Sequence, residues 1–77
     1  MNNCIQKDQM NEKIEKNFTY HAPKNNQVAR YEHVRNRAKV FAYFLLENVP
    51  DSEERSIALT RLEEVVFWSN AAIARNE

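Results

Sequence analysis

The chain has 77 residues, and its 11 Lys and Arg balance 11 Asp and Glu, so the formal net charge is zero. It has no glycine, two prolines and one cysteine, Cys4, which argues against a turn-rich β fold, an internal disulfide and a cysteine-rich zinc site. Neutrality argues against a binder of duplex DNA. No apolar run approaches the roughly 20 residues of a membrane span, and the first residues lack signal-peptide order. We therefore expect one small intracellular domain, with no membrane contact and an unreactive Cys4.

Residues 1–17 are mostly polar, with a few widely spaced apolar residues at Ile5, Met10 and Ile14. This pattern predicts an N-terminal arm or a short amphipathic helix, and we favour a helix that becomes ordered against a partner. Residues 18–26 follow as an irregular connector. Asn26, at its end, is a suitable N-cap for the next helix.

Residues 27–48 are predicted to form a long helix, because seam positions recur at alternating three- and four-residue steps. These positions are Val28, Tyr31, Val34, Ala38, Phe41, Leu45 and Asn48. Pro50 ends this stretch. Asp51, with Glu54 three positions later, resembles a capping box and predicts a second long helix over about 52–76.

The short turn at residues 48–50 makes the two long helices antiparallel neighbours. The predicted fold is all-α: an antiparallel two-helix hairpin over residues 18–77, preceded by the arm or short helix of residues 1–17. Val40, Phe44, Phe67 and Trp68 lie beyond the seam, and a single neighbouring helix cannot cover them. This apolar surplus predicts a homo-oligomer.

In such a hairpin, position 50 − n faces position 50 + n, which places Arg30 near Asn70 and Arg75 near the start of the first long helix. The connector enters at this same open end and brings Tyr20, His21 and Lys24 with it. The closed end is acidic instead. Its charged side chains are Glu47, Asp51, Glu53 and Glu54, with Arg55 beside them.

Arg35 and Lys39 are four residues apart and share one helix face. Arginine forks suit phosphate oxygens, and aromatic rings stack on bases, so a ligand with phosphates and bases is one interpretation of the open end. The residues alone favour the other interpretation, in which these charges form a solvated face and the tyrosines pack. Neither His21 nor His33 has an evident carboxylate partner, and no catalytic, metal or cofactor motif is present. We therefore predict a protein that is not an enzyme and uses no metal or cofactor.

Five segments together resemble the phage anti-CBASS cyclic-nucleotide sponge family, which is related to hairpin sponges that counter Thoeris defence. They are Phe18-Thr19-Tyr20-His21-Ala22-Pro23-Lys24, Arg30-Tyr31-Glu32 with Arg35, Pro50-Asp51-Ser52, Ala58-Leu59-Thr60-Arg61-Leu62-Glu63-Glu64, and Trp68-Ser69-Asn70-Ala71-Ala72-Ile73-Ala74-Arg75-Asn76-Glu77. The ending from Trp68 to Arg75 is the most specific element. The resemblance covers residues 18–77. It implies a homohexamer that sequesters cyclic di- and trinucleotides in the host cell cytoplasm, without cleaving them, and so blocks bacterial immune signalling.

The resemblance also implies roles for single residues. Tyr20 would stack on a base, Lys39 or Arg35 would contact cyclic dinucleotides, and Arg75 would contact phosphate in a separate trinucleotide pocket. The candidate ligand-binding residues are therefore Tyr20, His21, Lys24, Arg35, Lys39 and Arg75. Arg37 departs from the family pattern, which has a small residue before the basic position, and it would obstruct a pocket if it faced one. The alternative function is a small helical module that docks on a host or virion protein.

Overall fold

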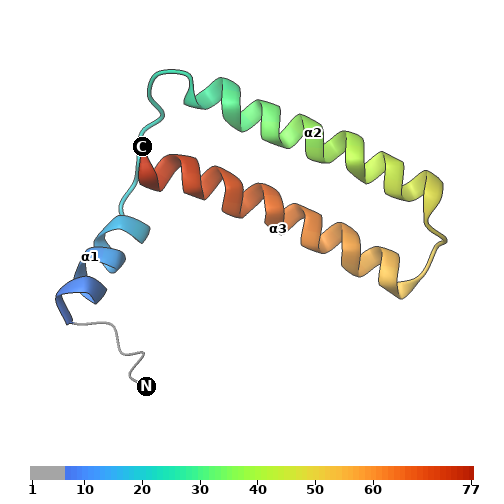
Figure 1. The fold of residues 1–77 in the computed structure, drawn as a ribbon, viewed down its shortest axis with the longest axis horizontal. Helices are drawn as coiled ribbons and strands as arrows, with labels where there is room; N and C mark the ends of the chain where they lie inside the picture. The colour runs from blue at the N-terminus through green and yellow to red at the C-terminus, as the bar shows by residue number, and fades with distance from the viewer. Residues whose placement is uncertain (1–6) are drawn as a thin grey trace.

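The computed structural model describes residues 7–77, which form three helices: α1 (Lys7–Asn17), α2 (Gln27–Asn48) and α3 (Glu53–Asn76). α2 and α3 run antiparallel, and α1 extends away from the open end of this hairpin (Figure 1). The all-α hairpin with a short N-terminal helix is therefore confirmed. The expectations for Cys4 and Ile5 concern residues outside the described part of the chain.

The turn between α2 and α3 is closed by polar contacts at its two sides. The N–H of Val49 donates to the carbonyl of Leu45 (2.9 Å), and Val49 then takes an extended conformation that directs the chain into Pro50. The guanidinium of Arg55 donates to the carbonyl O of Val49 and to the carboxylate of Asp51, both at 3.1 Å. Arg55 therefore ties the first turn of α3 back onto the loop.

Of the two predicted N-caps, Asp51 was wrong, and Asn26 stands at the N-cap position of α2 without a capping bond from its side chain. Ser52, not Asp51, caps α3: its backbone is extended, and its Oγ accepts from the N–H of Arg55 at 3.0 Å. Asp51 lies one residue too far from the first turn and pairs with the Arg55 side chain instead. Asn26 makes no capping hydrogen bond with its side chain, because its backbone (φ −93°, ψ 18°) lacks the extended conformation of an N-cap.

The seam between α2 and α3 is narrower than the sequence predicted. Its α2 side chains are half-buried or buried and fall at steps of three or four residues: Gln27, Tyr31, Val34, Ala38, Ala42 and Leu45. Three residues that were assigned to the seam are exposed: Val28 (52%), Phe41 (50%) and Asn48. With only one neighbouring helix, a stripe near the line of contact is covered, and side chains farther round α2 stay in solvent.

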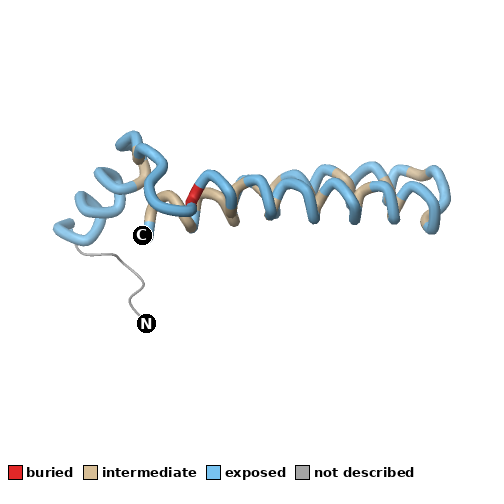
Figure 2. The backbone as a smooth tube through the Cα atoms, turned by 90° about the horizontal axis from the view of Figure 1, so that it is seen from above, coloured by how far each residue is buried: buried red, intermediate tan, exposed pale blue. Residues whose placement is uncertain are grey.

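The hairpin forms a single layer of helices (Figure 2). For the chain as a whole, with the projecting α1 included, the smallest extent is 17 Å and the radius of gyration is 16.8 Å, against about 11.5 Å for a compact domain of this length. The accessible surface of the whole chain is 6548 Å², whereas a compact monomer of this mass exposes about 4,900 Å². No hydrophobic side chain of the described residues is fully buried.

Candidate ligand-binding site

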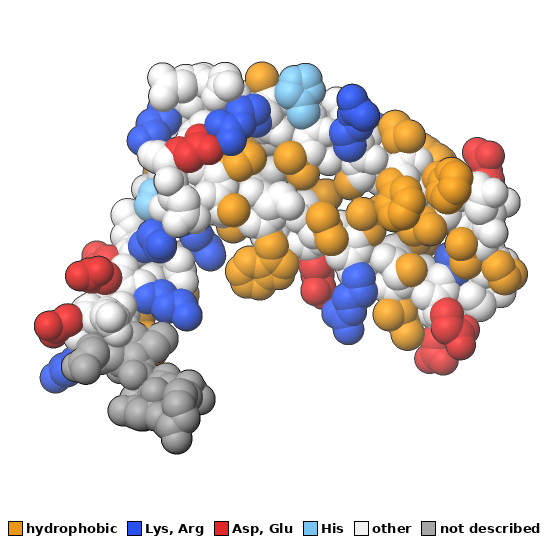
Figure 3. Space-filling view, in the orientation of Figure 1, with side chains coloured by type: hydrophobic (Ala, Val, Ile, Leu, Met, Phe, Trp, Pro, Cys, Tyr) orange, Lys and Arg blue, Asp and Glu red, His pale blue; other side chains and the backbone are white. Residues whose placement is uncertain are grey.

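The open end contains a shallow hollow of about 430 Å³, at the small end of the about 300–1,000 Å³ range of ligand pockets. Four segments meet there: the end of α1, the connector, the first half of α2 and the last turns of α3. The lining residues are Asn17, Thr19, Tyr20, His21, Tyr31, Arg35, Asn70, Ala71, Ala74 and Arg75. Several Lys and Arg side chains gather around this end on the face shown in Figure 3, and acidic side chains lie at the turn.

Four of the six predicted ligand-binding residues line this hollow: Tyr20, His21, Arg35 and Arg75. The ring of Tyr20 is 83% exposed and therefore accessible for stacking. No other described residue forms a hydrogen bond or ion pair with the guanidinium of Arg35 or Arg75. Both cations can therefore bind an anion without breaking an existing pair.

His21 fixes the start of the connector. Its Nε2 lies 2.7 Å from the carbonyl O of Lys16, so this nitrogen must be the donor. The Lys16 side chain, in turn, donates to Oδ1 of Asn76 at 3.3 Å. These contacts bring the end of α1 and the beginning of the connector beside the last turn of α3.

The other two candidates, Lys24 and Lys39, lie outside the hollow. Lys39 lines an apolar groove of about 510 Å³ between α2 and α3, and Arg35 borders both this groove and the hollow. Arg37 is two positions from Arg35, about 200° around the helix, and lines the opposite side of the seam. It therefore obstructs neither the hollow nor the Lys39 groove within one chain.

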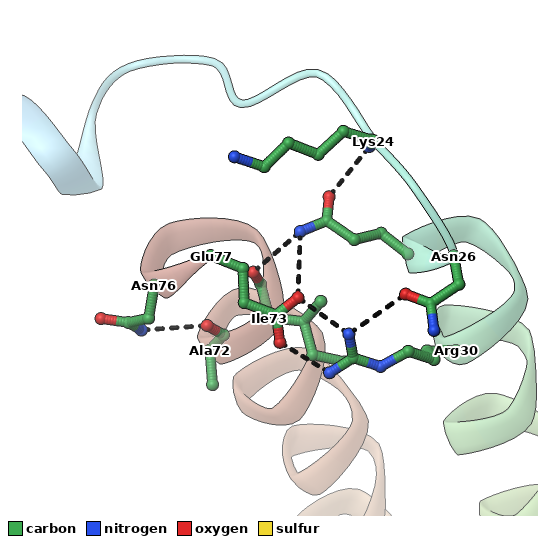
Figure 4. A network of polar contacts seen from close by, with 8 residues as sticks. Lys24, Asn26, Arg30, Ala72, Ile73, Asn76 and Glu77 are labelled. Carbon is green, nitrogen blue, oxygen red and sulfur yellow. Dashed lines mark hydrogen bonds and ion pairs between the residues drawn. The ribbon is translucent and has the colours of Figure 1, made fainter.

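Lys24 belongs to a polar network at the tip of the open end (Figure 4). Its backbone N–H donates to Oε1 of Gln27 at 3.0 Å. Nε2 of Gln27 donates to the carbonyl O of Ile73 (3.3 Å) and to Glu77 (3.4 Å). The pairing of residues 27 and 73 agrees with the predicted register about residue 50.

The guanidinium of Arg30 takes part in the same network. It pairs with Glu77 through two hydrogen bonds, at 2.8 and 2.6 Å, and donates to Asn26 at 3.4 Å. Hydrogen bonds from Arg30 and Gln27 lower the pKa of the Glu77 carboxyl below its ordinary value, and the charge of Lys24 adds to this effect. The bond to Glu77 raises the pKa of Arg30. Unlike Arg35 and Arg75, Arg30 therefore already has an anionic partner, Glu77.

Gln27 and Asn70 were missed as functional residues, and Tyr31 was assigned only to packing. Gln27 is 2% exposed and is the one buried residue among residues 7–77. Asn70 lines the hollow, and its Oδ1 is buried without a donor from any described residue. The available signal was a polar amide at a position whose spacing belongs to the apolar seam, since buried amides require partners.

Within residues 7–77, no three or more His, Cys, Asp or Glu side chains are placed to hold a metal ion. None of the described helices is both long enough and apolar enough to cross a bilayer. The arginines, aromatic rings and amide that line the hollow offer attraction of anions, stacking and hydrogen bonding.

Residues 10–74 match the Acb2/Tad1 hairpin domain, a family of anti-CBASS and anti-Thoeris sponges. Members of this family sequester cyclic oligonucleotides, which is a function of binding and not of catalysis. Searches among curated proteins and among solved structures gave no significant match. The family match spans most of the chain and covers the greater part of α1, all of α2 and nearly all of α3. The chain therefore belongs to the Acb2/Tad1 hairpin-domain family of cyclic-oligonucleotide sponges.

Proposed function

We propose that this protein binds cyclic di- and trinucleotide second messengers in the host cell cytoplasm and holds them without cleavage, thereby blocking anti-phage signalling. The observation that supports this most strongly is the grouping of Tyr20, Arg35 and Arg75 around one hollow, with both guanidinium groups unpaired among residues 7–77. Residues that are 55 positions apart in the chain, from 20 to 75, thereby face one ligand-sized space.

The side chains suit the chemistry of a cyclic oligonucleotide. Such a ligand has a ring of phosphodiesters and two or three bases. A planar guanidinium can donate two parallel hydrogen bonds to a phosphate, and an exposed tyrosine ring can stack on any base. Capture of this kind needs affinity and slow release, and it needs no general acid or base.

The proposed functional unit is a homo-oligomer, and the family resemblance suggests a hexamer. The hollow is open on a single chain, and large apolar side chains beside it are exposed, including Phe67 (65%) and Trp68 (66%). Assembly would cover these side chains and bring several copies of Arg35, Lys39 and Arg75 around one polyanion. Lys39, outside the hollow of one chain, would then contact ligand from a neighbouring copy.

The direct test is native mass spectrometry of the purified protein, alone and with cyclic tri-AMP and cyclic di-GMP as probes. We expect a homo-oligomer that gains discrete ligand masses, and we expect the ligand released by heating to have its original mass. An assembly that gains neither ligand would contradict the proposed function. Release of linear or shortened products would contradict capture without cleavage.

Arg35→Ala and Arg75→Ala should each weaken binding, because each removes an unpaired cation that lines the hollow. We expect a loss of about tenfold or more per variant, the size typical of a charge-assisted hydrogen bond. Arg37→Ala is the matched control, since it removes the same charge two positions away on the other side of α2. Isothermal titration calorimetry against both probes would measure the three variants. Equal losses at residues 35 and 37 would indicate a general charge effect and no specific site.

The alternative function, docking on a host or virion protein, is favoured by a different observation. The groove between α2 and α3 is lined largely by apolar side chains, among them Leu46, Leu59 and Phe67. Under this alternative the groove would stay accessible in the purified assembly, and neither nucleotide probe would change its melting temperature. Stabilisation by a nucleotide would favour the sponge, because a ligand that binds only the native state raises the melting temperature.

A further inference from the structure

The connector that carries Tyr20 and His21 is attached at both ends to the last turn of α3. At its N-terminal end, His21 bonds to the carbonyl of Lys16, and the Lys16 side chain bonds to Asn76. At its C-terminal end, the backbone of Lys24 bonds to Gln27, whose amide bonds to Ile73 and Glu77. The segment between the two attachments therefore has its position set relative to α3.

Arg75 belongs to that same turn of α3, between the residues that form the two attachments. Because the C-terminal attachment runs through Gln27 of α2, the position of the Tyr20 ring relative to the Arg75 guanidinium depends on how firmly this turn of α3 is held against α2. The shortest polar contact there is the ion pair of Arg30 with Glu77, with both terminal nitrogens of Arg30 donating to the carboxylate. This pair and Gln27 join α2, α3 and the connector at one point (Figure 4).

We propose that Arg30, Glu77 and Gln27 form a latch that positions Tyr20 against Arg75 for the cyclic oligonucleotide, and that Arg30 acts through Glu77 without contacting the ligand. This inference rests on the proposed function. Arg30 resembles a phosphate-binding residue by type and by its place at the open end, but its donors are directed at Glu77 and Asn26. Arg30 is therefore a positioning residue, whereas Arg35 and Arg75 are the cations directed to the ligand.

Gln27 explains why the latch can hold the connector. Its side chain makes three hydrogen bonds, to the connector, to the carbonyl of Ile73 and to Glu77, and it is almost fully buried. A buried amide that loses one of these partners is left with an unsatisfied group, which is costly. Breaking the Arg30–Glu77 pair frees Glu77, removes one partner of Gln27 and so loosens the N–H of Lys24.

The test is a charge swap across the latch. The variants are Arg30→Glu, Glu77→Arg and the double variant that restores the pair in the opposite orientation. These side chains are partly exposed, so the helices should survive the changes, whereas removal of the buried Gln27 amide risks unfolding. The control is the Arg61–Glu64 pair on α3, at 2.8 Å, with the same single and double swaps.

Two quantities are measured: affinity for cyclic tri-AMP and cyclic di-GMP by calorimetry, and exchange of the Lys24 amide proton in free protein by NMR. We expect each single swap to weaken binding about tenfold and to speed Lys24 exchange, and the double swap to restore most of both, since paired charges act as one unit. The swaps at residues 61 and 64 should change neither quantity.

The outcomes separate this inference from the proposed function. If the wild-type protein binds neither probe, the proposed function fails and the latch proposal fails with it. If the wild-type binds and the single swaps bind equally well, only the latch is wrong. A further variant, Glu77→Gln, tests for direct contact. If Glu77→Gln binds more tightly than the wild-type protein, and the double swap binds as weakly as the single swaps, then Arg30 contacts the ligand directly and Glu77 competes for Arg30. That result also overturns the proposal.

Discussion

At the scale of single residues, the open end distinguishes arginines by their partners. Arg30 makes an ion pair with Glu77, and no ion-pair partner of Arg35 or Arg75 occurs among residues 7–77. The sequence predicted ligand contact for Arg35 and Arg75 and placed Arg30 at the same end of the hairpin without a role. The distinction depends on which carboxylate is within reach, and among residues 7–77 Arg30 forms its ion pair with Glu77, beyond the last turn of α3.

The Arg30–Glu77 pair predicts a specific dependence on pH. The folded-state pKa of Glu77 is lowered from its ordinary value of 4.5, so the pair's stabilisation is present above about pH 4.5 and lost as pH falls through the folded-state pKa. Arg30, whose pKa is raised, stays charged throughout this range. We expect the wild-type protein to melt above Glu77→Gln at neutral pH.

This difference in melting temperature should shrink towards zero as the pH is lowered from about 7 to about 3, a range that spans the titration of carboxylates. Thermal unfolding followed by circular dichroism at matched protein concentrations would measure it. All other side chains are the same in both proteins, so their contributions cancel in the comparison. A difference that stays constant over the range would show that ionised Glu77 does not stabilise the fold.

At the scale of elements, a shift of one residue in the start of α3 changes which side chain caps the helix. Asp51 and Ser52 are both good N-cap types, so the sequence allows either to begin the helix. The extended backbone of Ser52 places its Oγ 3.0 Å from the N–H of Arg55, and Asp51 becomes a partner of the Arg55 side chain. Arg55 also donates to the carbonyl of Val49, so the turn and the cap depend on one another.

We predict that Ser52→Ala lowers the free energy of unfolding by about 1 kcal/mol, the usual cost of removing an N-cap. Asp51→Ala is the control and should cost less than about 0.5 kcal/mol, because its carboxylate is largely exposed and screened. Urea denaturation of both variants at one protein concentration would compare them. A larger loss for Asp51→Ala than for Ser52→Ala would contradict the assignment of the cap.

At the scale of the whole molecule, a single layer of two helices leaves too much apolar surface in water. The accessible surface exceeds that of a compact monomer of this mass by roughly a third. Phe41 and Phe44 stack with their ring centroids 5.9 Å apart, yet each is about half exposed. The stability of this chain should therefore depend on protein concentration, as expected when folding and assembly are coupled.

Phe67→Glu should disrupt the proposed assembly, because it places a charge on an apolar side chain that is 65% exposed and borders the groove. Analytical ultracentrifugation should show a smaller species than for the wild-type protein, and the melting temperature should fall. Glu63→Gln lies in the same groove and is the control, since it introduces no charge. An unchanged sedimentation coefficient for Phe67→Glu would exclude this face from the interface.

Much of the fold could be predicted from the sequence because its signals are local. Apolar periodicity, the absence of glycine and the stop at Pro50 are enough for two long helices and a short turn, and α2 begins and ends at the predicted residues 27 and 48. The antiparallel register about residue 50 also predicted that the start of α2 lies beside the end of α3, as the contact of Gln27 with Ile73 shows. The segments that resemble the sponge family predicted membership that the match over residues 10–74 confirms.

The tertiary structure determined which side chains form the seam and which line the hollow, because local sequence patterns do not fix these. The seam runs through Ala42 and leaves Phe41 in solvent, because contact with one neighbouring helix covers only a narrow stripe. Tyr20, Arg35 and Arg75 share a hollow, while Lys39 and Lys24 lie outside it, since helix rotation and the connector's path fix where each side chain points. Gln27 became the buried centre of the open end because its amide finds three partners from distant parts of the chain, and such pairing exists only after folding.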